Sequence, residues 1–152
     1  MKLIAIALLA AGFALPAGDP QGLFVWKSAD LKAYSKSLAP KINDKKVATE
    51  DIAKNGNYRF MVAHREASGE AEYHALDADI FVVQSGTGTL VYGGEMVDAK
   101  TTAPNEMRGP SIKGGMEKPL AAGDIVTIPA KLPHQVKLTG KEFTYFVIKV
   151  TQ

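Results

Sequence analysis

Four side chains in this sequence combine residue types and spacings that suit a metal ion. Glu72 and His74 lie two residues apart, and residues at that spacing on a β-strand point to the same face. Asp79 stands at the start of the apolar residues 80–83, where a carboxylate needs a positive partner such as a metal ion. His134 comes far downstream, after a short loop. We therefore expect His134 to complete one metal site with the other three residues.

The chemistry of these ligands narrows the choice of metal. Two carboxylates and two imidazoles form a hard to borderline set that suits manganese or ferrous iron, with zinc as a further candidate. Four protein ligands leave open positions on a six-coordinate ion, and a substrate or oxygen would bind there. The alternative is a barrel without metal, in which the two acids are solvated or ion-paired and the two histidines form structural hydrogen bonds.

Two other residues compete for a place in the site. Asp77 is a carboxylate close to Asp79, but it falls on an expected loop. His64, the remaining histidine, ends an expected strand and is followed by Arg65 and Glu66. A surface or hydrogen-bonded role explains His64 without a metal. We leave both residues out of the predicted site.

The pattern of the chain from residue 58 onward predicts the strands that would carry these side chains. Short β-branched and aromatic runs alternate there with Gly, Pro and Asp. Many short strands favour a β-sandwich or barrel, because each strand must bury one face against another sheet. Residues 95–120 form an insertion rich in Gly, Pro and Lys, which we expect to be a flap, a lid or a partly ordered loop. The expected strands are residues 58–64, 71–74, 80–84, 87–92, 125–128, 135–138 and 143–150.

The chain before residue 57 has a different character. Apolar residues recur at helical spacing over residues 29–39, which predicts one amphipathic helix that ends before Pro40. Residues 41–56 are polar and charged, so we expect a connection with at most one helical turn. The predicted organisation is an N-terminal arm over residues 18–56, followed by a barrel domain over residues 57–152.

The first residues have the pattern of a secretory signal peptide. Lys2 supplies a positive charge, residues 3–14 form an apolar run, and small residues follow as far as Ala17. We predict that residues 1–17 are a signal peptide, cleaved after Ala17 or Ala14, and that the mature protein is exported to the periplasm or secreted. The alternative is a buried N-terminal helix.

Composition and charge exclude several classes of partner. The net charge of +2 comes from 18 basic and 16 acidic residues spread along the chain, so we expect no nucleic acid partner. After the signal peptide, no segment approaches the roughly 20 apolar residues that a membrane span needs. The chain has no cysteine for a disulfide or a lipid anchor. A small molecule is the partner that the predicted site indicates.

The spacing of the candidate ligands resembles the first motif of the cupin superfamily, which reads G-x5-H-x-H-x3–4-E-x6-G. Glu72 stands at the first histidine of the motif and His74 at the second. Asp79 stands at the glutamate, and Gly86 matches the closing glycine. Glu66 occupies the position of the opening glycine, so the chain departs from the pattern there.

The second cupin motif, G-x5-P-x-G-x2-H-x3-N, is matched in the same order. Gly123, Pro129 and His134 stand at its glycine, proline and histidine. Lys131 replaces its internal glycine, and Leu138 replaces its closing asparagine. Two separated motifs thus agree in spacing with one family.

The resemblance covers about residues 57–150 and implies an all-β fold, the double-stranded β-helix or jelly-roll barrel, here with a short helical segment before it. It also implies that the four candidate ligands point into the barrel. Family members commonly hold manganese, iron, zinc, nickel or copper there, and some hold no metal. Because Glu72 and Asp79 are still oxygen donors, we expect a divalent metal at this site.

Three functions follow from these expectations. The preferred one is a metal-dependent enzyme, of an oxygenase, isomerase or lyase type, that acts on a small organic molecule in the barrel. The second is a non-catalytic module that binds a small ligand in the same cavity. The third is a structural barrel without metal, which would form a homodimer through an exposed sheet or the N-terminal arm. The fold alone does not choose among them.

Overall fold

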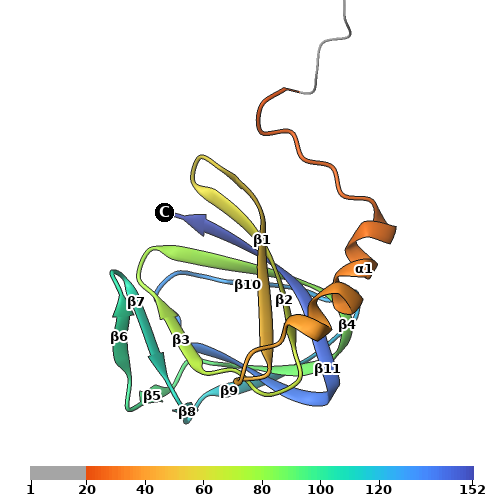
Figure 1. The fold of residues 1–152 in the computed structure, drawn as a ribbon. Helices are drawn as coiled ribbons and strands as arrows, with labels where there is room; N and C mark the ends of the chain where they lie inside the picture. The colour runs from red at the N-terminus through yellow and green to blue at the C-terminus, as the bar shows by residue number, and fades with distance from the viewer. Residues whose placement is uncertain (1–19) are drawn as a thin grey trace, which may run out of the picture.

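The structure, a computed structural model, describes residues 20–152 (Figure 1). The predicted signal peptide lies outside these residues. No helix in the described part of the chain is long and apolar enough to cross a membrane. The elements are helix α1 (Ser28–Leu38), the 3-10 turn η1 (Ala39–Lys41), and strands β1 (Val47–Asn55), β2 (Tyr58–Arg65), β3 (Ala71–His74), β4 (Asp77–Tyr92), β5 (Glu95–Val97), β6 (Lys100–Ala103), β7 (Glu106–Gly109), β8 (Ser111–Lys113), β9 (Met116–Ala121), β10 (Ile125–Ile128) and β11 (His134–Thr151).

Helix α1 confirms the predicted helix and covers the outside of the curled sheet, as Figure 1 shows. Asp30 accepts a hydrogen bond from the backbone N–H of Lys27 at 3.1 Å, which fixes the first turn. Leu38 packs with Val62 and Phe146 on the outer face of the barrel. The helix therefore supplies an apolar cover for strands whose other face points inward.

Strand β1 lies within residues 41–56, where we expected a connection. That expectation is wrong, because β1 pairs antiparallel with β2 along its whole length. The strand alternates exposed and partly buried residues, so its polar side chains face water while the backbone completes the sheet. Strand β1 thus extends the sheet back to Val47.

Strands β4 and β11 are each longer than the sequence pattern predicts. Residues 80–84 and 87–92 belong to the single strand β4, and residues 135–138 and 143–150 belong to the single strand β11. Gly86 allows β4 to continue, since its φ is +76° and an added Cβ would lie 1.9 Å from the carbonyl oxygen of Glu142. The two strands bend there instead of ending.

Strand β11 is the centre of the sheet topology. One of its edges pairs with β4, and the other pairs first with β3 and then with β2. The sheet runs in the order β1-β2-β11-β3-β7-β6, while β4 also pairs with β9 and β10. Figure 1 shows the sheet curling around an interior that these strands enclose. The all-β barrel that we predicted is therefore the fold of this chain.

The insertion at residues 95–120 is built from short strands, so the expectation of a partly ordered loop is wrong. Strands β5 and β8 form a separate two-stranded sheet, β6 pairs with β7, and β7 pairs with β3. Five of its residues line the central cavity: Thr102, Ala103, Glu106, Arg108 and Pro110. The insertion thus forms part of the cavity wall.

Candidate metal centre

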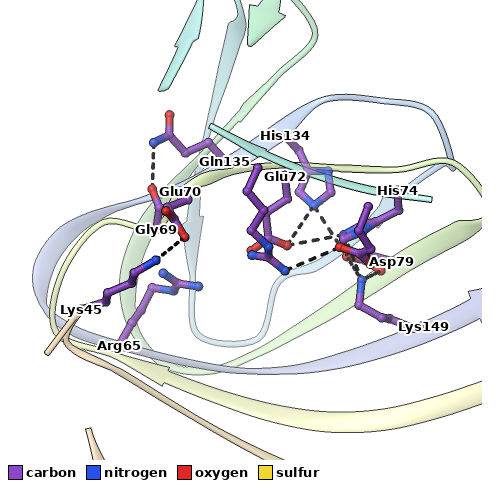
Figure 2. A network of polar contacts seen from close by, with 12 residues as sticks. Lys45, Arg65, Gly69, Glu70, Glu72, His74, Asp79, His134, Gln135 and Lys149 are labelled. Atoms are coloured by element: carbon purple, nitrogen blue, oxygen red, sulfur yellow. Dashed lines mark hydrogen bonds and ion pairs between the residues drawn. The ribbon is translucent and has the colours of Figure 1, made fainter. Parts of the chain in front are cut away.

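The register of the sheet brings the four predicted ligands together (Figure 2). Glu72 and His74 lie two residues apart on β3, as the alternation of a strand requires. Glu72 is also paired with His134, the first residue of β11. Asp79 lies near the start of β4, where that strand pairs with the far end of β11. Residues from three strands therefore meet at one point inside the barrel.

The ligand atoms of Glu72, His74, Asp79 and His134 all lie within 4.8 Å of one another. His74 Nε2 is 3.4 Å from Glu72 Oε2 and 3.4 Å from Asp79 Oδ2. His134 Nε2 is 3.6 Å from the same Asp79 oxygen. His74, Asp79 and His134 are no more than 3% exposed, and Glu72 is partly buried. The group is compact and largely shielded from water.

The outer nitrogens of both histidines are held by hydrogen bonds. His74 Nδ1 lies 2.7 Å from Glu106 Oε1, and His134 Nδ1 lies 3.0 Å from the carbonyl oxygen of Leu132. Both partners are hydrogen-bond acceptors, so Nδ1 of each ring is the donor. These hydrogen bonds fix the ring orientations and turn each Nε2 toward the centre of the group. His134 Nε2 is buried and has no hydrogen-bond partner among the described residues. Partners on the far nitrogen are the usual support of histidines that bind metals.

Lys149 of β11 lies beside the four-ligand group, and it was not among the residues predicted from the sequence. It is 8% exposed, and its Nζ lies 2.7 Å and 3.0 Å from the two oxygens of Asp79, its cross-strand partner. The same Nζ is 2.9 Å from His74 Nε2. When His74 is neutral, Nε2 accepts a hydrogen bond from Lys149, and when it is charged it donates to the acids. The sequence offered one indication that Lys149 is buried, namely its place within an apolar strand, where a lysine is unusual.

Arg108 of β7 was also not among the residues predicted from the sequence. It is the cross-strand partner of Glu72 and forms an ion pair with it. Its other terminal nitrogen lies 3.7 Å from Glu106 Oε2, and Glu106 is the cross-strand partner of His74. No sequence signal marked these two residues, because their role depends on the register between β7 and β3.

Burial and charge shift the pKa values of these groups. Burial raises the pKa of Glu72, but the hydrogen bond from His74 and the charge of Arg108 outweigh it and lower the pKa to about 2. Burial likewise opposes ionisation of Asp79, yet the nearby rings of His134 and His74 and the positive charge of Lys149 hold its pKa well below the usual range. Burial lowers the pKa of His74, whereas hydrogen bonds to Asp79 and Glu72 raise it to about 9. Both acids are therefore anionic, as a bound cation requires.

The two competing residues lie outside the group. Asp77 accepts a hydrogen bond from the Thr151 hydroxyl at 2.7 Å and is not among the converging ligand atoms. His64 is fully buried, and its Nδ1 forms a 2.7 Å hydrogen bond with the hydroxyl of Thr144. Its hydrogen-bonded role matches the interpretation that left it out of the site.

A cavity of about 910 Å³ adjoins the four-ligand group. Glu72, Asp79 and Lys149 line it on the side of the group, and Arg65 and Tyr145 line it as well. A volume of this size holds a small organic molecule. The arrangement therefore places buried carboxylates, a buried ammonium and a ligand-sized space side by side.

The residues present fit a divalent metal ion. Ligand atoms on opposite sides of an ion, with bonds of about 2.0–2.3 Å, are at most about 4.6 Å apart, which is close to the limit of 4.8 Å in this group. A bond to a metal would also satisfy the unpartnered Nε2 of His134. For His74 Nε2 to bind the same ion, Lys149 must release it while remaining beside Asp79.

Comparison with solved structures identifies the fold. KdgF from Halomonas sp. superposes with a TM-score of 0.54 at 13% identity, over 72% of this chain and 83% of the other. A cupin superfamily protein from Desulfitobacterium hafniense gives 0.50 at 15% identity, over 76% and 88%. The DMSP lyase DddQ from Ruegeria pomeroyi gives 0.51 at 15% identity, over 70% of this chain and 48% of the other.

These comparisons show that the chain has the cupin fold, as the two sequence motifs imply. No protein-family model matches the sequence, and no curated protein sequence is similar enough to count as a match. At identities this low the likeness extends to the fold alone. The chemistry must be argued from this chain's own residues.

The loop before His134 keeps the shape that the second motif implies in spite of its substitution. Lys131, at the position of the internal glycine, has a φ of +66°, a left-handed conformation that glycine adopts at lower cost. Its backbone N–H donates to the carbonyl oxygen of His74 at 2.8 Å. This hydrogen bond ties the loop that carries His134 to the strand that carries His74.

Proposed function

We propose that this protein is a metal-dependent enzyme that acts on a small organic molecule in the barrel cavity. The divalent ion, manganese or iron in preference to zinc, would be held by Glu72, His74, Asp79 and His134. The convergence of these four ligand atoms within 4.8 Å carries the proposal. The unpartnered His134 Nε2 and the anionic state of both acids support it.

The chain's own residues supply binding and proton transfer next to this position. When bound, the ion would polarise a carbonyl or carboxylate oxygen of the substrate. Lys149 holds a proton on Nζ, 2.7 Å from Asp79 Oδ1 and at the wall of the cavity, where it can donate to a substrate atom. Glu106 and Arg108 hold His74 and Glu72 in position.

A manganese titration tests the enzyme form of the proposal. Four protein ligands leave open positions on a six-coordinate ion, which water fills until a substrate replaces it. We expect water-proton relaxation to show that manganese bound to the wild-type protein keeps exchangeable water. The double variant His74→Ala, His134→Ala serves as the control and should bind no manganese at this site. Bound manganese without exchangeable water would indicate a structural ion and contradict the proposal.

A second candidate function is a ligand-binding barrel without metal. The position of Lys149 favours it, because its ammonium already neutralises Asp79 and contacts His74 Nε2. In that case manganese, iron and zinc would all fail to bind the wild-type protein, and small ligands would bind without turnover.

We also propose that residues 1–17 direct the protein to the periplasm or the medium. The charged, apolar and small residues of this segment support the proposal. The mass of the protein recovered from those fractions should lack the first 17 or the first 14 residues. Full-length protein found only in the cytoplasm would overturn it.

A further inference from the structure

The cavity contains a buried arginine that no carboxylate neutralises. Arg65, on β2, is 8% exposed and lines the cavity. Within residues 20–152, no carboxylate oxygen lies within 4.0 Å of its guanidinium. A buried cation without an anion costs free energy. The other four cations that line the cavity each have such a partner: Lys45 with Glu70, Arg59 with Asp51, Arg108 with Glu72, and Lys149 with Asp79.

The Arg65 guanidinium is positioned by a tyrosine hydroxyl. Its Nε and Nη2 donate to Tyr145 Oη at 3.1 Å and 2.9 Å. Two of its five N–H donors are thereby used, and the hydroxyl proton of Tyr145 is left free to donate because the oxygen accepts both bonds. Gly69 leaves room for Nη1, since an added Cβ at Gly69 would lie 2.5 Å from it. The pair thus presents a cation and several unused donors without an acceptor.

Arg65 lines the same cavity as Glu72 and Asp79 of the four-ligand group, and apolar side chains line it as well. In Figure 2 the Arg65 guanidinium lies on the side that faces the group. The Tyr145 ring packs against Phe81 at 4.8 Å between centroids, and Phe81 lies 6.3 Å from the His134 ring. Phe81 and Met61 also line the cavity. A carbon skeleton could therefore lie against Phe81 with polar groups at both ends.

The charges at the cavity favour an anion once a divalent ion is bound. Glu72, Asp79 and Glu106 contribute three carboxylates to this part of the cavity, and Arg65, Arg108 and Lys149 contribute three cations, so the formal charges are equal although Arg65 contacts no acid in the described part of the chain. A divalent ion would leave an excess of two positive charges in a largely buried space. An anionic ligand would remove that excess and would supply the missing partner of Arg65.

We propose that Arg65 and Tyr145 bind the carboxylate of a small organic acid whose other end reaches the four-ligand group. A guanidinium edge with an adjacent hydroxyl matches the two oxygens of a carboxylate. One unpaired arginine matches one negative charge better than the two of a phosphate. The inference rests on the proposed function for the role of the second end, but the carboxylate site itself is testable without the metal.

Calorimetric titration with four carboxylates tests this site: malonate, succinate, glutarate and benzoate. Inorganic phosphate and neutral succinamide are the comparison ligands. We expect at least one carboxylate to bind wild-type protein in both metal-free and manganese-loaded forms. The variant Arg65→Gln should weaken that binding by about 10- to 100-fold, the usual value of hydrogen bonds to a charged group. Arg59→Gln is the matched control, because Arg59 lines the same cavity with a carboxylate partner, and it should change affinity by less than about threefold.

Tyr145→Phe keeps the test valid if Arg65→Gln does not fold, since it removes only the hydroxyl. It should weaken carboxylate binding by about 3- to 10-fold and leave manganese affinity unchanged. The proposal is overturned if no carboxylate binds wild-type protein, if phosphate or succinamide binds more tightly than every carboxylate, or if Tyr145→Phe and any folded Arg65→Gln bind like wild type. Absence of manganese binding would overturn the proposed enzyme function alone, because carboxylate binding is measured without metal as well.

Discussion

The two faces of strand β11 have opposite chemistry. The inward face presents Tyr145 and Lys149 to the cavity, on either side of Val147. The outward face presents Phe146, which packs with Leu38 under helix α1. In most barrels the charged face is the wet one, whereas here a lysine and the acid that it contacts are buried inside.

This difference shows where the molecule retains a destabilising arrangement. Burying an ion pair is at best weakly stabilising compared with an apolar pair of similar volume. The outer face of β11 is stabilised by ordinary packing, including the edge-on contact of Tyr34 with Phe146 at 5.9 Å between ring centroids. Buried charges on the inner face are what we expect if that face serves the proposed function, whereas the outer face is stabilised by packing.

The largest predicted effect is a loss of unfolding free energy that manganese reverses on the inner face of β11 but not on the outer face. Lys149→Met leaves Asp79 without its closest cation, so we expect the metal-free variant to lose about 3 to 5 kcal/mol of unfolding free energy. Manganese should restore more stability to this variant than it adds to wild type, because the ion replaces the missing charge. Phe146→Ala should lose a similar amount through its cavity and gain nothing extra from manganese. Denaturant unfolding with and without manganese measures both variants. An equal gain of unfolding free energy from manganese in both would contradict the predicted difference between the two faces.

A second prediction compares two of the buried histidines, His134 at the four-ligand group and His64 outside it. His134→Ala removes a proposed ligand and should weaken manganese binding by more than about 100-fold, with the β-rich circular dichroism retained. His64→Ala removes the hydrogen bond with Thr144 and should cost about 1 to 3 kcal/mol of stability without changing manganese affinity. If both variants bind manganese like wild type, His134 is a structural residue.

The inner face should also make the metal-free protein sensitive to pH. The pKa of His74 is raised from 6.5 to about 9 in the folded protein, so its contribution is complete below pH 6.5 and is lost as the pH rises to about 9. The pKa of Glu72 is lowered from 4.5 to about 2, so its contribution is complete above pH 4.5 and is lost as the pH falls to about 2. The unfolding free energy should therefore be greatest between pH 4.5 and 6.5. It should fall by up to about 3 kcal/mol as the pH rises to about 9.

The variant His74→Asn is the control for the loss of unfolding free energy at alkaline pH. It should lack the loss between pH 6.5 and 9, because asparagine does not titrate. An unchanged loss at alkaline pH in this variant would assign that loss to another group.

The smallest predicted effect concerns the loop that positions His134. Lys131→Gly should raise the unfolding free energy by up to about 1 kcal/mol, because glycine adopts the left-handed conformation without strain. Manganese affinity should stay unchanged, since the hydrogen bond from the backbone N–H to His74 is kept. Thermal unfolding and a manganese titration would measure both, and a loss of stability would show that the lysine side chain has a stabilising contact of its own.

Local patterns predicted much of this molecule. Strand alternation placed Glu72 and His74 on one face, and the apolar run after Asp79 indicated that this acid is buried. Two motifs with the same spacing as a known fold predicted that His134 joins them. Strand β1 was missed because one of its faces is exposed and many of its residues are polar. A polar stretch of this kind looks like a loop in the sequence.

The remaining part of the site depends on registers that no local pattern contains. Glu106 and Arg108 meet His74 and Glu72 only because β7 pairs with β3 in one register. Lys149 meets Asp79 only because β11 pairs with β4 over its last residues. A shift of one residue would turn any of these side chains to the other face.

Elemental analysis of the purified protein is the direct test of a divalent metal held by Glu72, His74, Asp79 and His134. The protein is purified without chelators or a metal-binding tag, beside the double variant His74→Ala, His134→Ala. We expect close to one equivalent of manganese, iron or zinc in the natural protein and little in the variant. No metal in the natural protein, and no uptake when each ion is offered, would contradict this expectation and favour the ligand-binding barrel.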